Sequence, residues 1–239
     1  MRHSHFDNLV TPINRAALVR YYKTTQPFIR VNFSWLLYDY VSVEKYRLNS
    51  KDWGEIPSRE QCEVWTENYR QEWAEYEDKI LPALTETLGV TFYKQVIDVD
   101  VAPGIRAMSD PLILNFMYYP DQFVDSLTHE LIHLLLTDNH AYSLKEANQT
   151  VRLDEAWTDL FGKHDFDTLV HIPVYALHKY IYLDIMKNPE RLERDKYTVK
   201  DDEAYAKAWG YVDAHNYLEI ITALKNWYVA LPRSGKKTP

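Results

Sequence analysis

Residues 128–136, THELIHLLL, place two histidines and a glutamate within an otherwise apolar stretch. If the stretch is helical, His129 and His133 lie one turn apart along the axis and about 40° from each other around it. The surrounding leucines make this helix apolar nearly all round, which is typical of a buried helix. Burying three polar or ionisable side chains without partners costs on the order of several kcal/mol. Any fold that contains this helix therefore has to supply partners for them.

A divalent metal is one such partner. Two neutral imidazoles four residues apart on a helix can bind one zinc ion, and Glu130 can act as the general base toward a water held there. Hydrogen bonds between the two histidines and neighbouring groups are the alternative, because His-Glu-x-x-His fixes only three positions and also arises by chance. A third ligand elsewhere in the chain would favour the metal.

Residues 153–162, LDEAWTDLFG, offer that ligand. Glu155 and Asp159 are four residues apart on one face of a short predicted helix, which Gly162 is expected to end. We predict that Glu155 is the third metal ligand and that Asp159 accepts the second ring N–H of a ligating histidine. A solvent-facing acidic helix is the alternative. Trp157 and its apolar neighbours indicate that at least one face packs inward.

Composition limits the kind of protein and of site. With 239 residues, 46% hydrophobic and 26% charged, the chain can build one sizeable core or two modest lobes. The net charge of −8 argues against a nucleic-acid or anionic-membrane partner. A single cysteine, Cys62, excludes an intrachain disulfide and a thiolate zinc cluster. No apolar run long enough to span a membrane and no signal-peptide core is found, so we expect a cytoplasmic protein.

We predict an α+β fold in which a sheet-bearing half precedes a mainly helical half. Three segments have the pattern of strands: residues 29–35, 96–102 and 111–119. Ser58 and Gln61 form a plausible capping box at the start of a long helix that Gly89 is expected to end. From about residue 121 to 230, helical patterns dominate.

The motif His-Glu-Leu-Ile-His at 129–133, followed by Glu-Ala-Trp-Thr-Asp at 155–159, resembles the gluzincin metallopeptidases, the thermolysin-like and aminopeptidase-like clan. The resemblance covers roughly 30 residues strongly. It implies a zincin-like fold, with a small twisted sheet, a long helix and the active-site helix, followed by a helical lobe. It also implies an edge strand that aligns an extended substrate beside the active-site helix.

The same resemblance implies one zincin-like catalytic unit over residues 1–239. Its approximate parts are a sheet lobe with the active-site helix at 28–140, a helical lobe at 141–232 and a flexible tail at 233–239.

Other zincin types fit less well. The metzincin pattern requires glycine at position 136 and histidine at 139, where this chain has Leu136 and Asn139. An aspzincin would use an aspartate such as Asp154 as the third ligand, but Asp154 points about 100° away from Glu155 around the helix. Glu155 is the preferred ligand because it shares its face with Asp159.

In gluzincins a tyrosine or histidine on a later helix stabilises the developing oxyanion. Tyr211 and His215, four residues apart, resemble that element. The competing cluster is His171, Tyr175 and His178. With 19 tyrosines in the chain, most are expected to serve packing.

These observations predict a zinc-dependent peptidase with one zinc per chain, which hydrolyses peptide bonds in a peptide or protein substrate with Glu130 as the base. One alternative is a zinc-containing module that binds a peptide or protein without cutting it. Another is a zincin hydrolase that acts on a non-peptide bond, because function belongs to the site rather than to the fold. The intact Glu130 favours hydrolysis.

Overall fold

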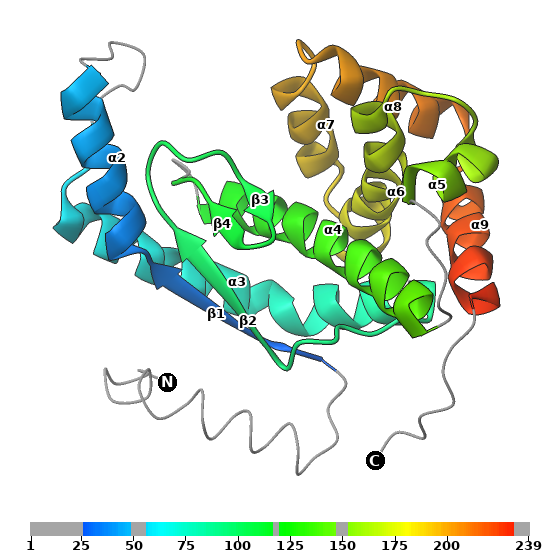
Figure 1. Ribbon diagram of the computed structural model, residues 1–239, viewed down its shortest axis with the longest axis horizontal. Coiled ribbons are helices and arrows are strands. Elements are labelled where there is room, and N and C mark those ends of the chain that lie inside the picture. The colour runs from blue at the N-terminus through cyan, green and yellow to red at the C-terminus, as the bar shows by residue number, and fades with distance from the viewer. Residues whose placement is uncertain (1–25, 49–55, 117–119, 147–152, 232–239) are drawn as a thin grey trace. The chain divides into compact units, whose positions relative to one another are not determined.

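The computed structural model describes residues 26–48, 56–116, 120–146 and 153–231 (Figure 1). The chain divides into two compact units, one made of residues up to 78 together with 92–131, the other of 79–91 together with 132–239. The boundary crosses two helices, α3 (Arg59–Leu88) and α4 (Pro120–Glu146). The predicted α+β class is confirmed. The predicted catalytic unit and its lobes stay a prediction, and the predicted tail at 233–239 lies outside the described residues.

The first unit contains a four-stranded sheet of order β1-β2-β4-β3. Its strands are β1 (Phe28–Phe33), β2 (Val96–Val101), β3 (Met108–Ser109) and β4 (Leu112–Leu114). Strands β1, β2 and β4 are parallel, and β3 is antiparallel to β4. Ile29 and Val31 are buried, whereas Arg30 points to the other face and pairs with Asp98 of β2. One face of the sheet is therefore apolar and the other polar.

The long helix α3 begins and ends where the sequence predicts. The backbone N–H of Ser58 donates to Gln61 Oε1 at 2.8 Å, and the N–H of Gln61 donates to Ser58 Oγ at 3.3 Å. This reciprocal pair is the predicted capping box. Gly89 follows the last turn with a φ of +67°, a conformation that favours glycine.

Within the first unit, α3 packs against both the sheet and the start of α4. Arg70 Nε donates to the carbonyl of Val31 in β1 at 2.8 Å. The Tyr69 ring stacks on Phe123 of α4 with centroids 4.4 Å apart. Both aromatic side chains are fully buried, so they form part of the core on which the start of α4 rests. Helix α2 (Trp35–Leu48) follows β1 directly.

Two predicted strands are shorter in the structure than in the sequence analysis. The first was expected to reach Trp35. Instead, the N–H of Ser34 donates to the carbonyl of Val101 in β2, and the carbonyl of Ser34 accepts the N–H of Tyr38. This second bond begins helix α2 directly after the strand. Trp35 is 46% exposed rather than buried. The third was expected over 111–119, of which 117–119 lie outside the described residues. In the described part the strand ends at Leu114, where Asn115 Oδ1 accepts the N–H groups of Gly104 and Phe116.

The second unit is helical in its described part. It contains the ends of α3 and α4, then α5 (Leu153–Phe161), α6 (Phe166–Tyr180), the π-helical turn η2 (Ile181–Ile185), α7 (Pro189–Thr198), α8 (Glu203–Ala214) and α9 (Tyr217–Ala230). Every residue of α6 from Thr168 to His178 is buried, so α6 lies at the centre of this unit. Thr168 Oγ1 donates to the carbonyl of Ala204 at 3.1 Å and thereby joins α6 to α8. None of the described helices combines the length and the apolar character needed to cross a bilayer.

Candidate metal centre

Helix α4 carries His129, Glu130 and His133, as the sequence predicts. The apolar residues around them, Leu127, Leu131, Ile132, Leu135 and Leu136, are fully buried. Both histidine side chains are half-buried, and Glu130 is only 7% exposed. The unit boundary passes between Leu131 and Ile132. One continuous helix, with His129 one turn before His133, therefore sets the spacing of the two rings.

A third histidine, His171 of α6, joins this pair. His129, His133 and His171 each offer one ring nitrogen, and these three nitrogens lie within 4.8 Å of one another. In the second unit, the His133 and His171 rings meet edge to face, with centroids 5.0 Å apart and an angle of 82°. Among the described residues these are the side chains that can hold a metal ion together. The three form what we call the histidine group.

The orientation of His171 is fixed by its own helix. Its Nδ1 lies 2.6 Å from the carbonyl oxygen of Asp167, one turn earlier in α6. Because a carbonyl oxygen can only accept, Nδ1 carries the hydrogen in the neutral ring. The acceptor nitrogen of His171 is therefore Nε2. A hydrogen bond of this kind is what orients metal-ligating histidines and fixes their tautomer.

His133 is held neutral by its surroundings. Burial lowers the pKa of His133 to about 3, and repulsion from His171 and His178 in their protonated forms adds to the shift. A neutral imidazole keeps a lone pair at ordinary pH, which is the form that binds a metal.

Glu130 has the opposite shift. Burial of its carboxyl raises the pKa of Glu130 to about 7, and the nearby Arg106 guanidinium, in the same unit, opposes that rise. This pKa is close to the value that suits a general base at neutral pH.

The predicted carboxylate partners on α5 lie elsewhere. Glu155 and Asp159 are both exposed, and neither belongs to the histidine group. Trp157, which is 1% exposed, occupies the inward side of α5. Glu155 and Asp159 each lie two residues from Trp157, about 200° around the helix, so they turn outward. Asp154, the alternative ligand, is half-buried and also outside the group.

Tyr211 and His215, the predicted oxyanion donors, lie together at the end of α8. His215 is the exposed residue that ends the helix, and its Nδ1 lies 2.8 Å from the carbonyl of Tyr211. The two rings stack with centroids 4.0 Å apart. Tyr211 also contacts His164 and Phe161 edge-on. The described ring contacts of this pair are therefore with each other and with the end of α5.

Tyr205 is a residue that sequence reasoning missed. Its ring, on α8, lies 4.3 Å from that of His171, nearer than the ring of Tyr175 at 5.6 Å. Tyr205 is half-buried, whereas Tyr175 is 1% exposed. Nothing in the spacing distinguishes Tyr205 from the other tyrosines of the chain. The competing cluster named from the sequence did contain His171.

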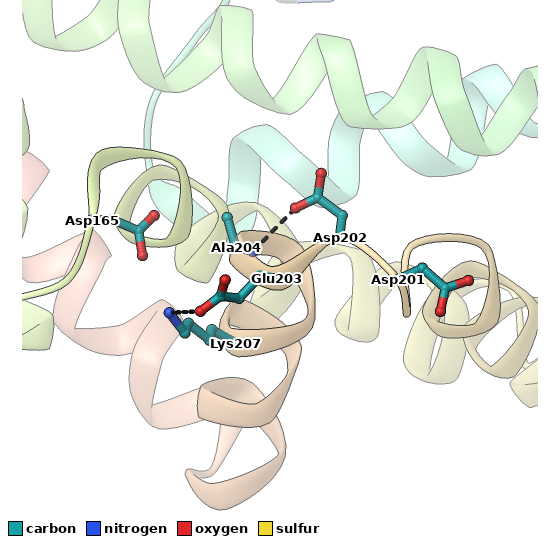
Figure 2. A pocket seen from close by; sticks show the side chains of 6 residues that line it. All are labelled: Asp165, Asp201, Asp202, Glu203, Ala204 and Lys207. Carbon is teal, nitrogen blue, oxygen red and sulfur yellow. Dashed lines mark hydrogen bonds and ion pairs between the residues drawn. The ribbon is translucent and has the colours of Figure 1, made fainter.

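A pocket lies in the second unit, at the starts of α6 and α8 (Figure 2). The pocket, of about 520 Å³, is lined by Asp165, Asp201, Asp202, Glu203, Ala204 and Lys207. Its carboxylates have local roles: Asp165 caps α6, Asp202 caps α8, and Glu203 pairs with Lys207 at 2.7 Å. This pocket does not include the histidine group.

Comparison of the chain with the models of known protein families, with curated proteins and with solved structures gave no match. The chemistry of this protein therefore has to be argued from the histidine group, Glu130 and the residues around them.

Proposed function

We propose that this protein is a zinc-dependent hydrolase that cleaves peptide bonds, with zinc on His129, His133 and His171 and with Glu130 as the general base. The observation that carries the proposal is the approach of three ring nitrogens to within 4.8 Å of one another, next in sequence to a buried carboxyl group. His171 takes the place that the gluzincin resemblance gives to Glu155.

The donor set fits zinc. Imidazole nitrogen is a common zinc ligand, and three protein ligands with one open position are typical of catalytic zinc sites. Two features of the structure prepare the ligands. The Asp167 carbonyl fixes His171 with Nε2 as its acceptor, and burial keeps His133 neutral. His133 therefore does not have to lose a proton before it binds.

Zinc, when bound, polarises a carbonyl group and lowers the pKa of water. Glu130 would accept the proton of the attacking water and deliver it to the leaving amine, a role that its raised pKa supports. Tyr205 is our candidate for the donor to the developing oxyanion, since its ring packs against His171. It replaces Tyr211 and His215 in that proposed role.

The buried Glu130 favours hydrolysis over the alternative of a zinc module that only binds. A carboxyl group whose pKa is raised by burial is unfavourable for folding when it ionises. A site that only binds metal through three histidines does not require this destabilising carboxyl group, whereas hydrolysis requires a general base. The choice of a peptide bond rests on the resemblance of residues 129–133 to the gluzincins, and a non-peptide bond remains the second candidate.

Exposure of the purified protein to a mixed peptide library, read by mass spectrometry with and without a chelator, tests the proposal. We expect about one zinc per chain by elemental analysis and cleavage that the chelator abolishes. Glu130→Gln should keep the zinc and lose about 10²- to 10⁴-fold in rate, because an amide cannot accept the proton.

Three other outcomes would contradict parts of the proposal. A protein that holds zinc but cleaves no peptide would favour a binding module or a non-peptide substrate. A Glu130→Gln variant that cleaves as fast as the parent would remove Glu130 from the reaction. Absence of zinc from the parent would remove the metal site itself.

A further inference from the structure

A second buried histidine lies on the helix that carries His171. His178 comes seven residues later in α6, so the two side chains share a face and are separated by two turns, about 10 Å along the axis. His178 is 1% exposed. A histidine buried to this degree requires polar partners in the interior.

Those partners come from the next two elements of the second unit. Nδ1 of His178 lies 3.1 Å from Asp195 Oδ2 of α7 and 2.9 Å from the hydroxyl of Tyr182 in the π-helical turn. The Tyr182 hydroxyl also donates to the same carboxylate oxygen, at 3.3 Å. The three side chains form a closed hydrogen-bonded cluster, which we call the His178 cluster.

The cluster determines which nitrogen of His178 carries the hydrogen. An ionised carboxylate only accepts, so Asp195 requires an N–H at Nδ1. Nε2 is then the acceptor nitrogen of the neutral ring. In carboxylate–histidine–metal triads a carboxylate likewise accepts from one ring nitrogen and leaves the other with its lone pair.

His133 connects this cluster to the histidine group. Its ring contacts that of His171 edge to face, with centroids 5.0 Å apart, and His171 and His178 lie on the same face of α6. A histidine that binds a metal through one nitrogen usually donates its other ring N–H to an acceptor. For His171 this acceptor is the carbonyl of Asp167.

We propose that His178, fixed by Asp195 and Tyr182, is a positioning residue for zinc, and that its Nε2 accepts the ring N–H of His133 in the zinc-loaded protein. The inference rests on the proposed zinc site. Asp195 would then act on the metal through two imidazoles, by holding His178 in the tautomer that can accept and by raising the basicity of His133.

Asp195→Asn tests the proposal because it preserves shape while it reverses the hydrogen bond. The asparagine amide can donate to Nδ1, which allows the His178 ring to carry its hydrogen on Nε2 and face His133 as a donor. We expect zinc affinity, measured by competition with a chelating dye, to fall about 10- to 100-fold. The unfolding midpoint of the zinc-free variant serves as the structural readout.

Asp213→Asn is the matched control. Asp213 pairs with Lys179 and Lys196, the sequence neighbours of His178 and Asp195, and it belongs to the same unit. This variant also removes a charged partner from α6 and α7, but we expect its zinc affinity to equal that of the parent. Tyr182→Phe leaves the carboxylate in place, so we expect a loss in the same direction as that of Asp195→Asn but smaller.

The outcomes separate this inference from the proposed function. If the parent binds zinc and His171→Ala does not, while Asp195→Asn and Tyr182→Phe bind like the parent, the cluster is only structural and the inference is wrong. A fall in the zinc-free unfolding midpoint with unchanged zinc affinity leads to the same conclusion. If Asp195→Asn does not fold, unchanged zinc affinity in Tyr182→Phe overturns the inference. If the parent binds no zinc, both the inference and the proposed function fail.

Discussion

Helices α5 and α6 follow one another in the second unit, and each carries two polar side chains that could serve a metal site. On α5 these are Glu155 and Asp159, spaced by four residues. On α6 they are His171 and His178, spaced by seven. The α5 pair is exposed, whereas the α6 pair is buried and hydrogen-bonded to a carbonyl and to a carboxylate.

The difference follows from the apolar residues that share each helix. Helix α5 has a distinct buried side, made of Ala156, Trp157 and Phe161, which leaves its other side to water. Helix α6 is buried through all its turns from Thr168 to His178, so its histidines have no exposed side to occupy. A polar group in such a helix has to find an interior partner or lose several kcal/mol, on the order of a desolvated amide. The spacing therefore shows that two side chains share a face of a helix, whereas burial shows whether that face meets the protein interior or water.

The largest expected effect concerns zinc affinity. His171→Ala removes one of three proposed ligands and should weaken zinc binding by more than about 100-fold, beyond the loss expected for a residue behind a ligand. Glu155→Ala, the matched change on α5, should leave the affinity unchanged, because Glu155 is exposed and outside the histidine group. Competition with a chelating dye measures both. The reverse result would restore Glu155 as the ligand and with it the gluzincin arrangement.

A second prediction compares the two helices through stability. Leu177 of α6 is fully buried, so Leu177→Ala should lower the free energy of unfolding by about 2–5 kcal/mol. Asp159→Ala on the exposed side of α5 should change it by no more than about 0.5 kcal/mol. Urea unfolding in the presence of a chelator measures both without a contribution from zinc. Equal losses would show that α5 is buried on both sides in solution.

The smallest effect concerns Glu130 of α4, whose carboxyl group is buried, unlike those of Glu155 and Asp159 on α5. Its pKa in the folded protein, about 7, lies above its ordinary value of 4.5, so ionisation of Glu130 disfavours the folded state. This cost is fully present above pH 7 and disappears below pH 4.5. Glu130→Gln should therefore stabilise the zinc-free protein by about 1–3 kcal/mol at pH 8.

That gain should shrink as the pH falls toward 4.5, which thermal unfolding at a series of pH values can follow. A gain that is the same at pH 8 and pH 5 would mean that it does not arise from ionisation of Glu130. Asp159→Gln is the control. We expect no comparable gain from it, since the carboxyl group of Asp159 is already exposed to water.

Much of the fold could be predicted because it depends on local chemistry. The capping box at Ser58 and Gln61, the glycine after α3 and the helix around His129 and His133 all follow from neighbouring residues. The ends of β1 and β4 were mispredicted, since each depends on a bond made from outside the strand. The division into two units depends on contacts between distant segments, which local patterns do not show.

The site was predictable only in part for the same reason. His129, Glu130 and His133 form a local pattern on one helix, and the structure retains it. The third member of the group comes from another helix, and the sequence favoured the carboxylates of α5 because their spacing was suitable. The spacing cannot show that Trp157 turns them outward. His171 entered the sequence analysis only as a possible oxyanion donor.

The helix that carries His133 is held by segments made much later in synthesis. In the second unit, the buried hydroxyl of Tyr228 in α9 donates to the carbonyl of Leu136 in α4 at 2.7 Å, across 92 residues of sequence. Trp227 stacks on His140 of the same helix, with ring centroids 5.4 Å apart. On the ribosome, α4 emerges well before α9 exists, at a rate of about 5–20 residues per second. For several seconds this apolar helix therefore lacks its anchoring tyrosine, and its contacts with α9 form only after almost the whole chain has been synthesised.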